Sequence, residues 1–461
     1  MLPEEFLNGI REMIGEEETL LLEHACEEEA VKALRLNPLK KAAAGGADLV
    51  SEIKLEKLSY EEDGYLFDPE CVPGRRPFHD AGAYYIQDPG AMIPGAILRS
   101  GGYLKEGMKV LDLCASPGGK STQAASAMAG KGILFSNEIV KNRCAVLSGN
   151  IERMGITNAV VLNESPERLS ERFPGYFDIV IVDAPCSGEG LFRKNSDAVS
   201  QWSRENVNMC AGRQESILED AYTCLKSGGI LLYSTCTFER AENEDRVSGL
   251  IEKHPDMKLL NTDFFKEKAE GLRDGFGSCR DAVRVWPMYF NGEGHFAALL
   301  EKEGSTADLL PPGGYEPSSD VKNRKALDEF LSETLTEEAA ALITSAKDRF
   351  RLFGDNLFIM PADTPALSGL KVARCGLHIG TFKKDRFEPA HALALVLGEG
   401  DVRLSKRVGE DEAESFVKGM TLSGEGKGWC LISAGGYSLG WGKVSGGIIK
   451  NHYPKGLRIQ G

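Results

Sequence analysis

The apolar residues between positions 108 and 235 form short continuous runs that are separated by helical patterns. We predict strands over residues 110–113, 132–136, 159–162, 177–182 and 229–234, and helices over residues 120–129 and 141–154. Runs of Ile, Val and Leu without polar alternation are typical of strands buried on both faces. Their alternation with helices indicates a parallel sheet, so this part of the chain has the pattern of a doubly wound α/β fold.

The flanking segments have other patterns. Residues 1–80 indicate a small α+β unit, with an acidic helix over residues 2–22 and a second helix over 27–36. Residues 308–320 are rich in Pro, Gly and Ser and predict a linker over 304–320. Residues 321–385 mix helix and strand, and residues 386–461 are mainly β with Gly-rich turns. We therefore expect the parallel sheet to occupy a domain over 81–303, with two further units after the linker.

Charge and cysteine content narrow the class of protein. The net charge is −15, yet residues 371–461 hold 14 Lys and Arg against 9 Asp and Glu. A basic end on an acidic body suits local contact with a polyanion. Eleven cysteines without a Cys-x-x-Cys pair predict free thiols and no metal site. No apolar run approaches the roughly 20 residues of a membrane span, and no signal peptide is evident, so we expect a cytoplasmic protein.

A glycine turn follows the first predicted strand. Its residues are Cys114, Ala115, Ser116, Pro117, Gly118, Gly119 and Lys120. A phosphate-binding P-loop needs glycine at position 114, which is Cys, and the dinucleotide motif is also absent. A helix N-terminus after such a turn holds a carboxylate as readily as a phosphate. S-adenosylmethionine has a carboxylate and a ribose but no phosphate, and the two glycines would let the backbone approach it.

Glu138 supports the same cofactor. It stands at the end of the second predicted strand, about 20 residues after the glycine turn, where a carboxylate binds ribose hydroxyls in related folds. The sequence therefore predicts a site for S-adenosylmethionine.

Two cysteines follow later strands of the predicted sheet. Cys186 comes after Asp183, Ala184 and Pro185, and Cys236 lies between two threonines. Ligands of open α/β sheets bind at the carboxyl ends of the strands, where both cysteines are expected. A thiolate that adds to carbon 6 of cytosine makes carbon 5 nucleophilic enough to take a methyl group. Asp183 could hydrogen-bond the protonated ring nitrogen, and the second thiol could assist release.

These motifs resemble the RNA 5-methylcytosine methyltransferases of the NOL/NOP/Sun group. The resemblance lies in residues 112–120, 183–190 and 234–237, and extends to 87–90, 284–287 and 292–296. Residues 439–443 and 450–456 are similar to an RsmF-like bacterial branch, whose tail is a PUA-like RNA-binding module. The resemblance implies a Rossmann-like methyltransferase core with a small α+β N-terminal domain and a mainly β PUA-like C-terminal domain.

The resemblance also implies roles for single residues. Cys236 would be the nucleophile, Cys186 would assist product release, and Asp183 would lie by the methyl group and the base. Residues 114–120 would form the cofactor loop, with Glu138 and Arg143 on the ribose and adenosine side. Asn163, Glu164 and Ser165 stand where other members carry an Asp near the adenine.

The implied cofactor is S-adenosylmethionine. The implied partner is RNA, specifically small-subunit ribosomal RNA or the small subunit, with no membrane contact and a monomeric enzyme. We expect the aromatic residues Phe387, Trp441 and Tyr453 to grip the RNA.

Other functions remain open on the sequence alone. The chain could methylate tRNA, or it could be a non-catalytic RNA-binding protein that uses its C-terminal module. A P-loop-like hydrolase is disfavoured by Cys114. DNA cytosine methyltransferases are a weaker alternative, because they place the nucleophile in the Pro-Cys motif.

Overall fold

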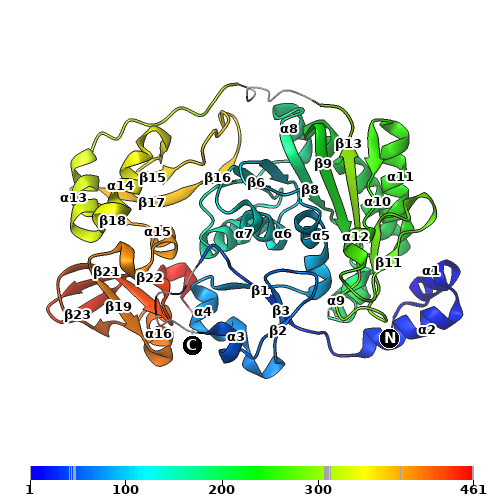
Figure 1. The fold of residues 1–461 in the computed structure, drawn as a ribbon, viewed down its shortest axis with the longest axis horizontal. Coiled ribbons are helices and arrows are strands. Elements are labelled where there is room, and N and C mark those ends of the chain that lie inside the picture. Colours follow the sequence, from blue (N-terminus) through cyan, green and yellow to red (C-terminus); the bar gives the residue numbers. More distant parts are fainter. Residues whose placement is uncertain are drawn as a thin grey trace.

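The computed structural model describes residues 2–458, except 41, 43, 45–47, 195, 306–310, 312 and 385. Figure 1 shows a large central sheet, with the N-terminal strands below it and the C-terminal region on the left. The C-terminal region is coloured from yellow to red, and it lies beside both the central sheet and the N-terminal strands.

The central sheet has five parallel strands in the order β9-β8-β5-β6-β7. Their bounds are Lys109–Asp112 for β5, Ile133–Asn137 for β6, Ala159–Leu162 for β7, Phe177–Asp183 for β8 and Leu225–Thr235 for β9. All neighbouring pairs in this set are parallel, which confirms the predicted strands and the doubly wound fold. Alternate residues enter two separate cores, as Val110 and Leu111 do, so the sheet is buried on both faces.

Helices cover both faces. The first core contains side chains of α5 (Pro89–Ser100), α6 (Gly119–Met128) and α7 (Lys141–Arg153). The second contains side chains of α8 (Pro166–Arg172), α10 (Arg204–Cys224) and α11 (Glu244–Lys253). The short helices α9 (Ser196–Gln201) and α12 (Asp263–Lys266) lie in the connections. The loops at the carboxyl ends of the strands are thereby held between two packed layers.

Antiparallel strands extend both edges of the sheet, and the sequence analysis missed them. On one side, β13 (His295–Lys302) pairs with β9, followed by β12 (Val283–Val285) and β11 (Arg273–Asp274), and β10 (Met257–Leu259) pairs with β13. On the other side, β16 (Val372–Cys375) pairs with β7. Because β16 follows the expected linker in sequence, the C-terminal region is joined to the central sheet by backbone hydrogen bonds.

The N-terminal region differs from the prediction in two places. The single helix over residues 2–22 is wrong, because Gly15 adopts φ of 86° and divides α1 (Glu4–Ile14) from α2 (Glu16–Glu27). The helix over 27–36 is also wrong, because these residues contain β1 (Ala33–Leu36). This strand pairs with β3 (Gly64–Leu66) and β4 (Tyr84–Ile86), so pairing with distant segments overrides a weak local helix preference.

The rest of the N-terminal sheet completes an α+β unit. Its strand order is β2-β3-β1-β4, with β2 at Glu56–Lys57, and its short helices are α3 (Leu49–Glu52) and α4 (Pro77–Asp80). Strand β4 follows residue 80, so this sheet continues beyond the boundary expected there.

The C-terminal region contains two small sheets. The first has the order β14-β15-β17-β18, at Phe350–Phe353, Asn356–Ile359, Leu377–Lys383 and Arg386–Pro389, after helices α13 (Arg324–Thr334) and α14 (Glu337–Ser345). The second has the order β19-β21-β22-β23-β20, at Ser405–Val408, Gly428–Ala434, Tyr437–Ser445, Ile448–Asn451 and Leu422–Ser423, with helices α15 (His391–Val396) and α16 (Glu410–Val417). Strands β17 and β18 pair across residue 385, so the segments on either side of that expected boundary share a sheet. Of the expected linker, residues 306–310 and 312 lie outside the described part of the chain.

The three aromatic residues expected to grip RNA belong to the core instead. Phe387, Trp441 and Tyr453 are all buried, and the indole Nε1 of Trp441 donates to the carbonyl of Ala390 at 3.0 Å. Trp441 also packs against Phe330 of α13, which joins the two small sheets in one apolar cluster. Their expected contact with RNA is therefore wrong, because side chains with almost no exposed surface cannot stack on bases.

Among the described helices, none combines the length and apolar content that crossing a bilayer requires.

Candidate active site

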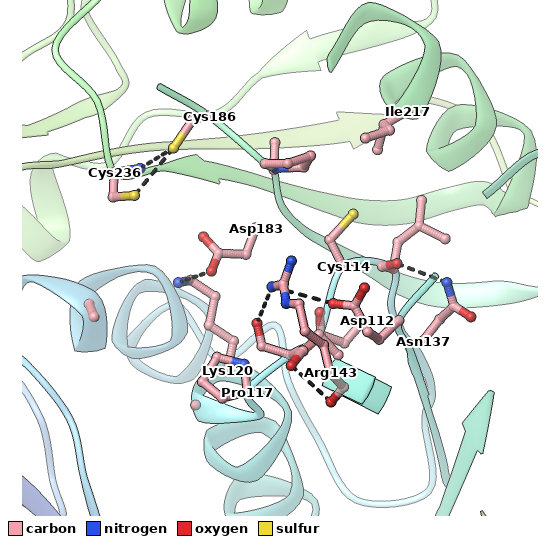
Figure 2. A pocket seen from close by; sticks show the side chains of 18 of the residues that line it. Asp112, Cys114, Pro117, Lys120, Asn137, Arg143, Asp183, Cys186, Ile217 and Cys236 are labelled. Carbon is pink, nitrogen blue, oxygen red and sulfur yellow. Dashed lines mark hydrogen bonds and ion pairs between the residues drawn. The ribbon is translucent and has the colours of Figure 1, made fainter. Parts of the chain in front are cut away.

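A cleft of about 1050 Å³ opens at the carboxyl ends of the parallel strands. It brings together nearly all residues that the sequence analysis singled out. They are Cys114, Ala115, Ser116, Pro117, Gly119, Lys120, Glu138, Arg143, Asp183, Cys186 and Cys236. Figure 2 shows the two cysteines on one side of Asp183 and the residues of the glycine turn on the other. Gly118 is not among the lining residues, although its neighbours on both sides are.

The glycine turn is held from both sides by the sheet. Leu113 donates its N–H to Ile181 of β8 at 2.9 Å, and Ala115 donates to Asn137 of β6 at 2.8 Å. The Ser116–Pro117 peptide bond is cis, and Gly118 has φ of 117°, a left-handed value that favours glycine. Helix α6 then begins at Gly119, so its free N–H groups lie at the cleft.

The structure gives a further reason for glycine at position 119. A Cβ atom on Gly119 would lie 3.2 Å from the amide nitrogen of Gln87, so the close neighbour is a protein side chain. Gln87 in turn accepts a hydrogen bond from the guanidinium of Arg35 at 2.8 Å. The glycine therefore leaves room for a contact between the N-terminal region and the turn.

Glu138 and Arg143 lie together on the far side of the turn. The buried carboxylate of Glu138 accepts the N–H of Val140 at 2.8 Å and lies 3.3 Å from Arg143 Nη2. Arg143 Nη2 also donates to the carbonyl of Ser116 at 3.1 Å, and Ser116 Oγ donates to the carbonyl of Arg143. These contacts fix the start of α7 beside the glycine turn.

Asn163 and Glu164, in the segment that departs from the family pattern, make hydrogen bonds that hold neighbouring loops. Asn163 Nδ2 donates to the carbonyls of Glu138 and Ile139 at 2.7 and 2.9 Å, while Ser165 lines the cleft. Glu164 is buried, and it accepts the N–H of Lys371 at 2.7 Å.

A lysine and two aspartates occupy the floor of the cleft. Lys120 Nζ lies 2.8 Å from Asp183, whose other oxygen accepts a hydrogen bond from Ser234 at 2.9 Å. Asp112, fully buried at the end of β5, accepts from Ser121 Oγ at 2.7 Å. Burial raises the pKa of Asp112 to about 7, against the effect of the Ser121 bond. The sequence analysis gave Asp112 no role of its own, although its place at a strand end is the signal that identified Glu138.

The two cysteines are in direct contact. Their Sγ atoms lie 3.2 Å apart, and the N–H of Cys236 points to the Sγ of Cys186 at 3.4 Å. Both are free thiols. The hydrogen bond to the Cys236 thiol, together with burial, raises the pKa of Cys186 well above its ordinary value. Cys186 is therefore a protonated thiol near neutral pH. Burial likewise raises the pKa of Cys114, which argues against Cys114 as a nucleophile.

Another wall of the cleft comes from residues that the sequence analysis noted but did not assign. Asp88 accepts the N–H groups of Gly90 and Glu293 at 2.7 and 2.9 Å. Burial, followed by the charge of Asp88, raises the pKa of Glu293 to about 7. Burial lowers the pKa of His295 to about 4, so this imidazole is neutral. The sequence analysis noted the motif at residues 292–296, but the spacing of these residues does not by itself indicate a chemical role.

The cleft suits S-adenosylmethionine. Asp112 Oδ1 is buried and has no hydrogen-bond partner among the described residues, so it can accept from an ammonium group. The N-terminus of α6 suits a carboxylate, and Glu138 suits a ribose diol. Within the described residues, no group of three or more His, Cys, Asp or Glu side chains could hold a metal ion.

Four family models match successive parts of the chain. They are the N-terminal domain of 16S rRNA methyltransferase RsmF over residues 2–89, 16S rRNA methyltransferase RsmB/F over 103–301, the RsmF rRNA methyltransferase first C-terminal domain over 329–397, and the methyltransferase RsmF PUA domain over 404–459.

Whole-length relatives agree with these models. The chain is 31% identical to "Ribosomal RNA small subunit methyltransferase F" of Aeromonas salmonicida, over 94% of this chain and 92% of the relative. It is 30% identical to the protein of the same name from Vibrio vulnificus, over 99% and 97% of the two chains.

Solved structures match the fold. A methyltransferase homolog protein from Pyrococcus horikoshii aligns with a TM-score of 0.55 at 25% identity, over 65% of this chain and 95% of that one. NSun6 from the same organism, solved with SFG, an analogue of S-adenosylmethionine, has a TM-score of 0.55 at 20% identity, over 66% and 99%. This second match supports the fold alone.

These matches confirm the resemblance seen in the sequence, including the PUA module. They confirm an RNA cytosine-5 methyltransferase that uses S-adenosylmethionine, with ribosomal RNA as its substrate class. The chain belongs to the RsmF branch of the RsmB/F family of 16S rRNA methyltransferases.

Proposed function

We propose that this enzyme methylates carbon 5 of a cytidine in small-subunit ribosomal RNA through a covalent adduct with Cys236. The observation that carries this mechanism is the contact between two free thiols, 3.2 Å apart, in the cleft that also contains the glycine turn. Two thiols in one site suit a reaction in which one attacks and the other handles a proton.

Each step of the mechanism has a balanced electron flow. The Cys236 thiolate adds to carbon 6 of cytosine, and the ring electrons move to carbon 5. Bound S-adenosylmethionine would supply an electrophilic methyl group. Carbon 5 would bond to this methyl group as its bond to the sulfonium sulfur breaks, and the sulfur would keep that electron pair. A base removes the carbon 5 proton, and the electrons of that C–H bond re-form the ring double bond and expel Cys236 as thiolate.

The remaining groups have roles that fit their surroundings. Cys186, protonated and in contact with Cys236, can exchange a proton with that sulfur and so assist its release. Asp183 can hydrogen-bond the protonated ring nitrogen, because Lys120 and Ser234 hold its carboxyl group in place. For the cofactor, residues 114–120 would bind the amino acid end, and Glu138 and Arg143 would bind the ribose and adenosine side.

The relatives support the small subunit as the source of the RNA, because the names of those reported above specify it. A PUA model also matches the C-terminal residues 404–459. We further propose that the enzyme is cytoplasmic and acts as a monomer. Light scattering of the purified protein with and without RNA would test the monomeric state.

Two measurements test this function. Calorimetry should detect binding of S-adenosylmethionine and no binding of ATP. Bisulfite mapping of ribosomal RNA from a strain that lacks the gene should reveal a lost 5-methylcytidine, which the wild-type gene restores. Unchanged small-subunit RNA together with lost methylation in tRNA would favour the tRNA alternative.

A further inference from the structure

Two buried glutamates connect the loops that carry the cysteines. Glu189 belongs to the loop after β8, three residues beyond Cys186, but its carboxylate faces the other loop. Its Oε2 accepts the hydroxyl of Thr237 at 2.8 Å and the N–H of Phe238 at 3.0 Å. Its Oε1 accepts the indole N–H of Trp202 at 2.8 Å. Glu189 thus fixes the two residues that follow Cys236.

Glu242 makes the reverse connection. It follows β9 in sequence, six residues beyond Cys236, and its carboxylate accepts both the N–H and the hydroxyl of Ser187. The amide of Gln214 adds a third hydrogen bond to the same carboxylate at 2.8 Å. Glu242 thus fixes the residue that follows Cys186, and each loop supplies the carboxylate that holds the other.

Direct contacts complete the arrangement. The hydroxyls of Ser187 and Thr237 lie 2.8 Å apart, and Gly190 donates its N–H to the carbonyl of Cys236 at 2.9 Å. Glu189 and Glu242 have no exposed surface. Burying a carboxylate costs several kcal/mol, which only well-placed donors offset. Apolar side chains would fill this space at lower cost in free energy, but they would not fix the position of one loop relative to the other.

We propose that Glu189 and Glu242 are positioning residues that set the relative placement of the Cys186 and Cys236 thiols for the methylation reaction. The assignment rests on the proposed function, because it assumes that both sulfur atoms act on the same cytosine ring. A misplacement of about 1 Å at a reacting group can lower a rate about 100-fold. Neither glutamate is among the residues that line the cleft, so each acts through its loop.

The test compares Glu189→Gln and Glu242→Gln with wild-type protein. Glutamine keeps the shape but turns one acceptor into a donor, which faces the N–H and O–H donors of the opposite loop. We expect kcat for 5-methylcytidine formation to fall at least tenfold, while the KM values for S-adenosylmethionine and RNA stay within twofold. Adduct formation with RNA that contains 5-fluorocytidine, which cannot lose a proton from carbon 5, should slow by the same factor.

Glu316→Gln is the matched control. Glu316 is also a buried carboxylate that accepts a backbone N–H, from Leu367 at 2.7 Å, and pairs with Arg351 at 2.7 Å, but it lies outside the cleft. We expect this variant to keep the wild-type kcat even where its melting temperature falls. The assignment is refuted if the two single variants, Glu189→Gln and Glu242→Gln, fold and keep either the wild-type kcat or normal adduct formation.

A second measurement does not depend on methylation. Dibromobimane becomes fluorescent when it bridges two neighbouring thiols, and peptide mapping identifies the bridged pair. We expect bridging of Cys186 to Cys236 in the wild type and in Glu316→Gln, and at least fivefold slower bridging in the two glutamine variants. Equal bridging in all four proteins would overturn the positioning role. If the wild-type thiols can be bridged but untreated wild-type protein forms no 5-methylcytidine, the proposed function is refuted instead.

Discussion

The Sγ atoms of Cys186 and Cys236 lie 3.2 Å apart although fifty residues separate them in the chain. Strands β8 and β9 are parallel neighbours, with Asp183 opposite Ser234 at their carboxyl ends. Each cysteine follows its strand by one to three residues, so the sheet brings them to the same point. The hydrogen bond to the Cys236 thiol, together with burial, raises the pKa of Cys186 well above its ordinary value.

The asymmetry between the two cysteines leads to opposite expectations for their removal. Cys236→Ala should abolish methylation, because no bond to carbon 6 can form. Cys186→Ala should still attack and methylate but release product slowly, which leaves a covalent enzyme–RNA complex. The complex is measured as a slowly migrating band on a denaturing gel.

The double variant, with both cysteines changed to Ala, is the control and should show no band. A band from Cys236→Ala and none from Cys186→Ala would reverse the two roles. Two unstable variants without any band would indicate that the cysteines are structural.

Arg35 is expected to affect cofactor binding from outside the cleft. This buried guanidinium donates from Nη2 to the carbonyl of Gly119 at 2.9 Å and to Thr122 Oγ1 at 2.8 Å. Arg35→Lys keeps the charge but loses the planar fork, so the start of α6 should lose its fixed position. Calorimetry should show an affinity for S-adenosylmethionine at least fivefold lower, which corresponds to about 1 kcal/mol.

Arg99→Lys provides the comparison for this experiment. Arg99 also contacts the N-terminal region, but it pairs with the acidic side chains of Glu62 and Asp63 rather than with the glycine turn. Its substitution should leave cofactor affinity within twofold of wild type. Equal affinity of Arg35→Lys and wild type would show that the turn keeps its shape without the guanidinium.

The parallel strands could be predicted because their signal is local. An uninterrupted apolar run such as residues 179–182 has few alternatives to a buried strand, and the site residues then follow from the rule for strand ends. Strand β1 could not be predicted in this way. Its pairing with β3 and β4 depends on residues about 30 and 50 positions away, which no local pattern reveals.

The interior contacts of the site were also beyond the sequence. The sequence shows no structural role for Glu189 and Glu242, because only the relative position of the two loops brings each carboxylate to the backbone of the opposite loop. The aromatic residues gave a misleading signal for a similar reason. Trp441 is in a basic, Gly-rich segment, but packing against Phe330 buries it.

Asp112 predicts a pH dependence of stability. The pKa of its carboxyl rises from an ordinary value of 3.8 to about 7 in the folded protein, first because it is buried. The folded state therefore binds more protons than the unfolded state between about pH 4 and pH 7, and the free energy of unfolding should fall as pH rises through this window. The slope from this one group is at most about 1.4 kcal/mol per pH unit.

Asp112→Asn removes this contribution, because the amide does not ionise. The stability of the variant relative to wild type should therefore increase from pH 4.5 to pH 7.5, as measured by urea unfolding at both values. The exposed Asp411 supplies the matched substitution Asp411→Asn. A difference between Asp112→Asn and wild type that stays constant with pH would contradict the buried-acid interpretation.

Because Trp441 and Tyr453 are buried, we expect charged side chains of the C-terminal region to contact the RNA instead. Lys427, Lys450 and Lys455 are exposed in the C-terminal region, which the PUA model matches. Contacts between lysine and phosphate release counterions, so each one adds about 0.7–0.9 to the slope of log affinity against log salt concentration. Changing all three lysines to Ala should weaken RNA binding at least tenfold at low salt and reduce this slope by about 2, while S-adenosylmethionine binding stays unchanged.

Filter binding at several salt concentrations measures both the affinity for RNA and the slope. Lys325→Ala on α13, also exposed, is the control for a lysine outside this region. A triple variant with wild-type affinity and slope would show that the RNA lies elsewhere, and the basic C-terminal surface would then have no part in binding.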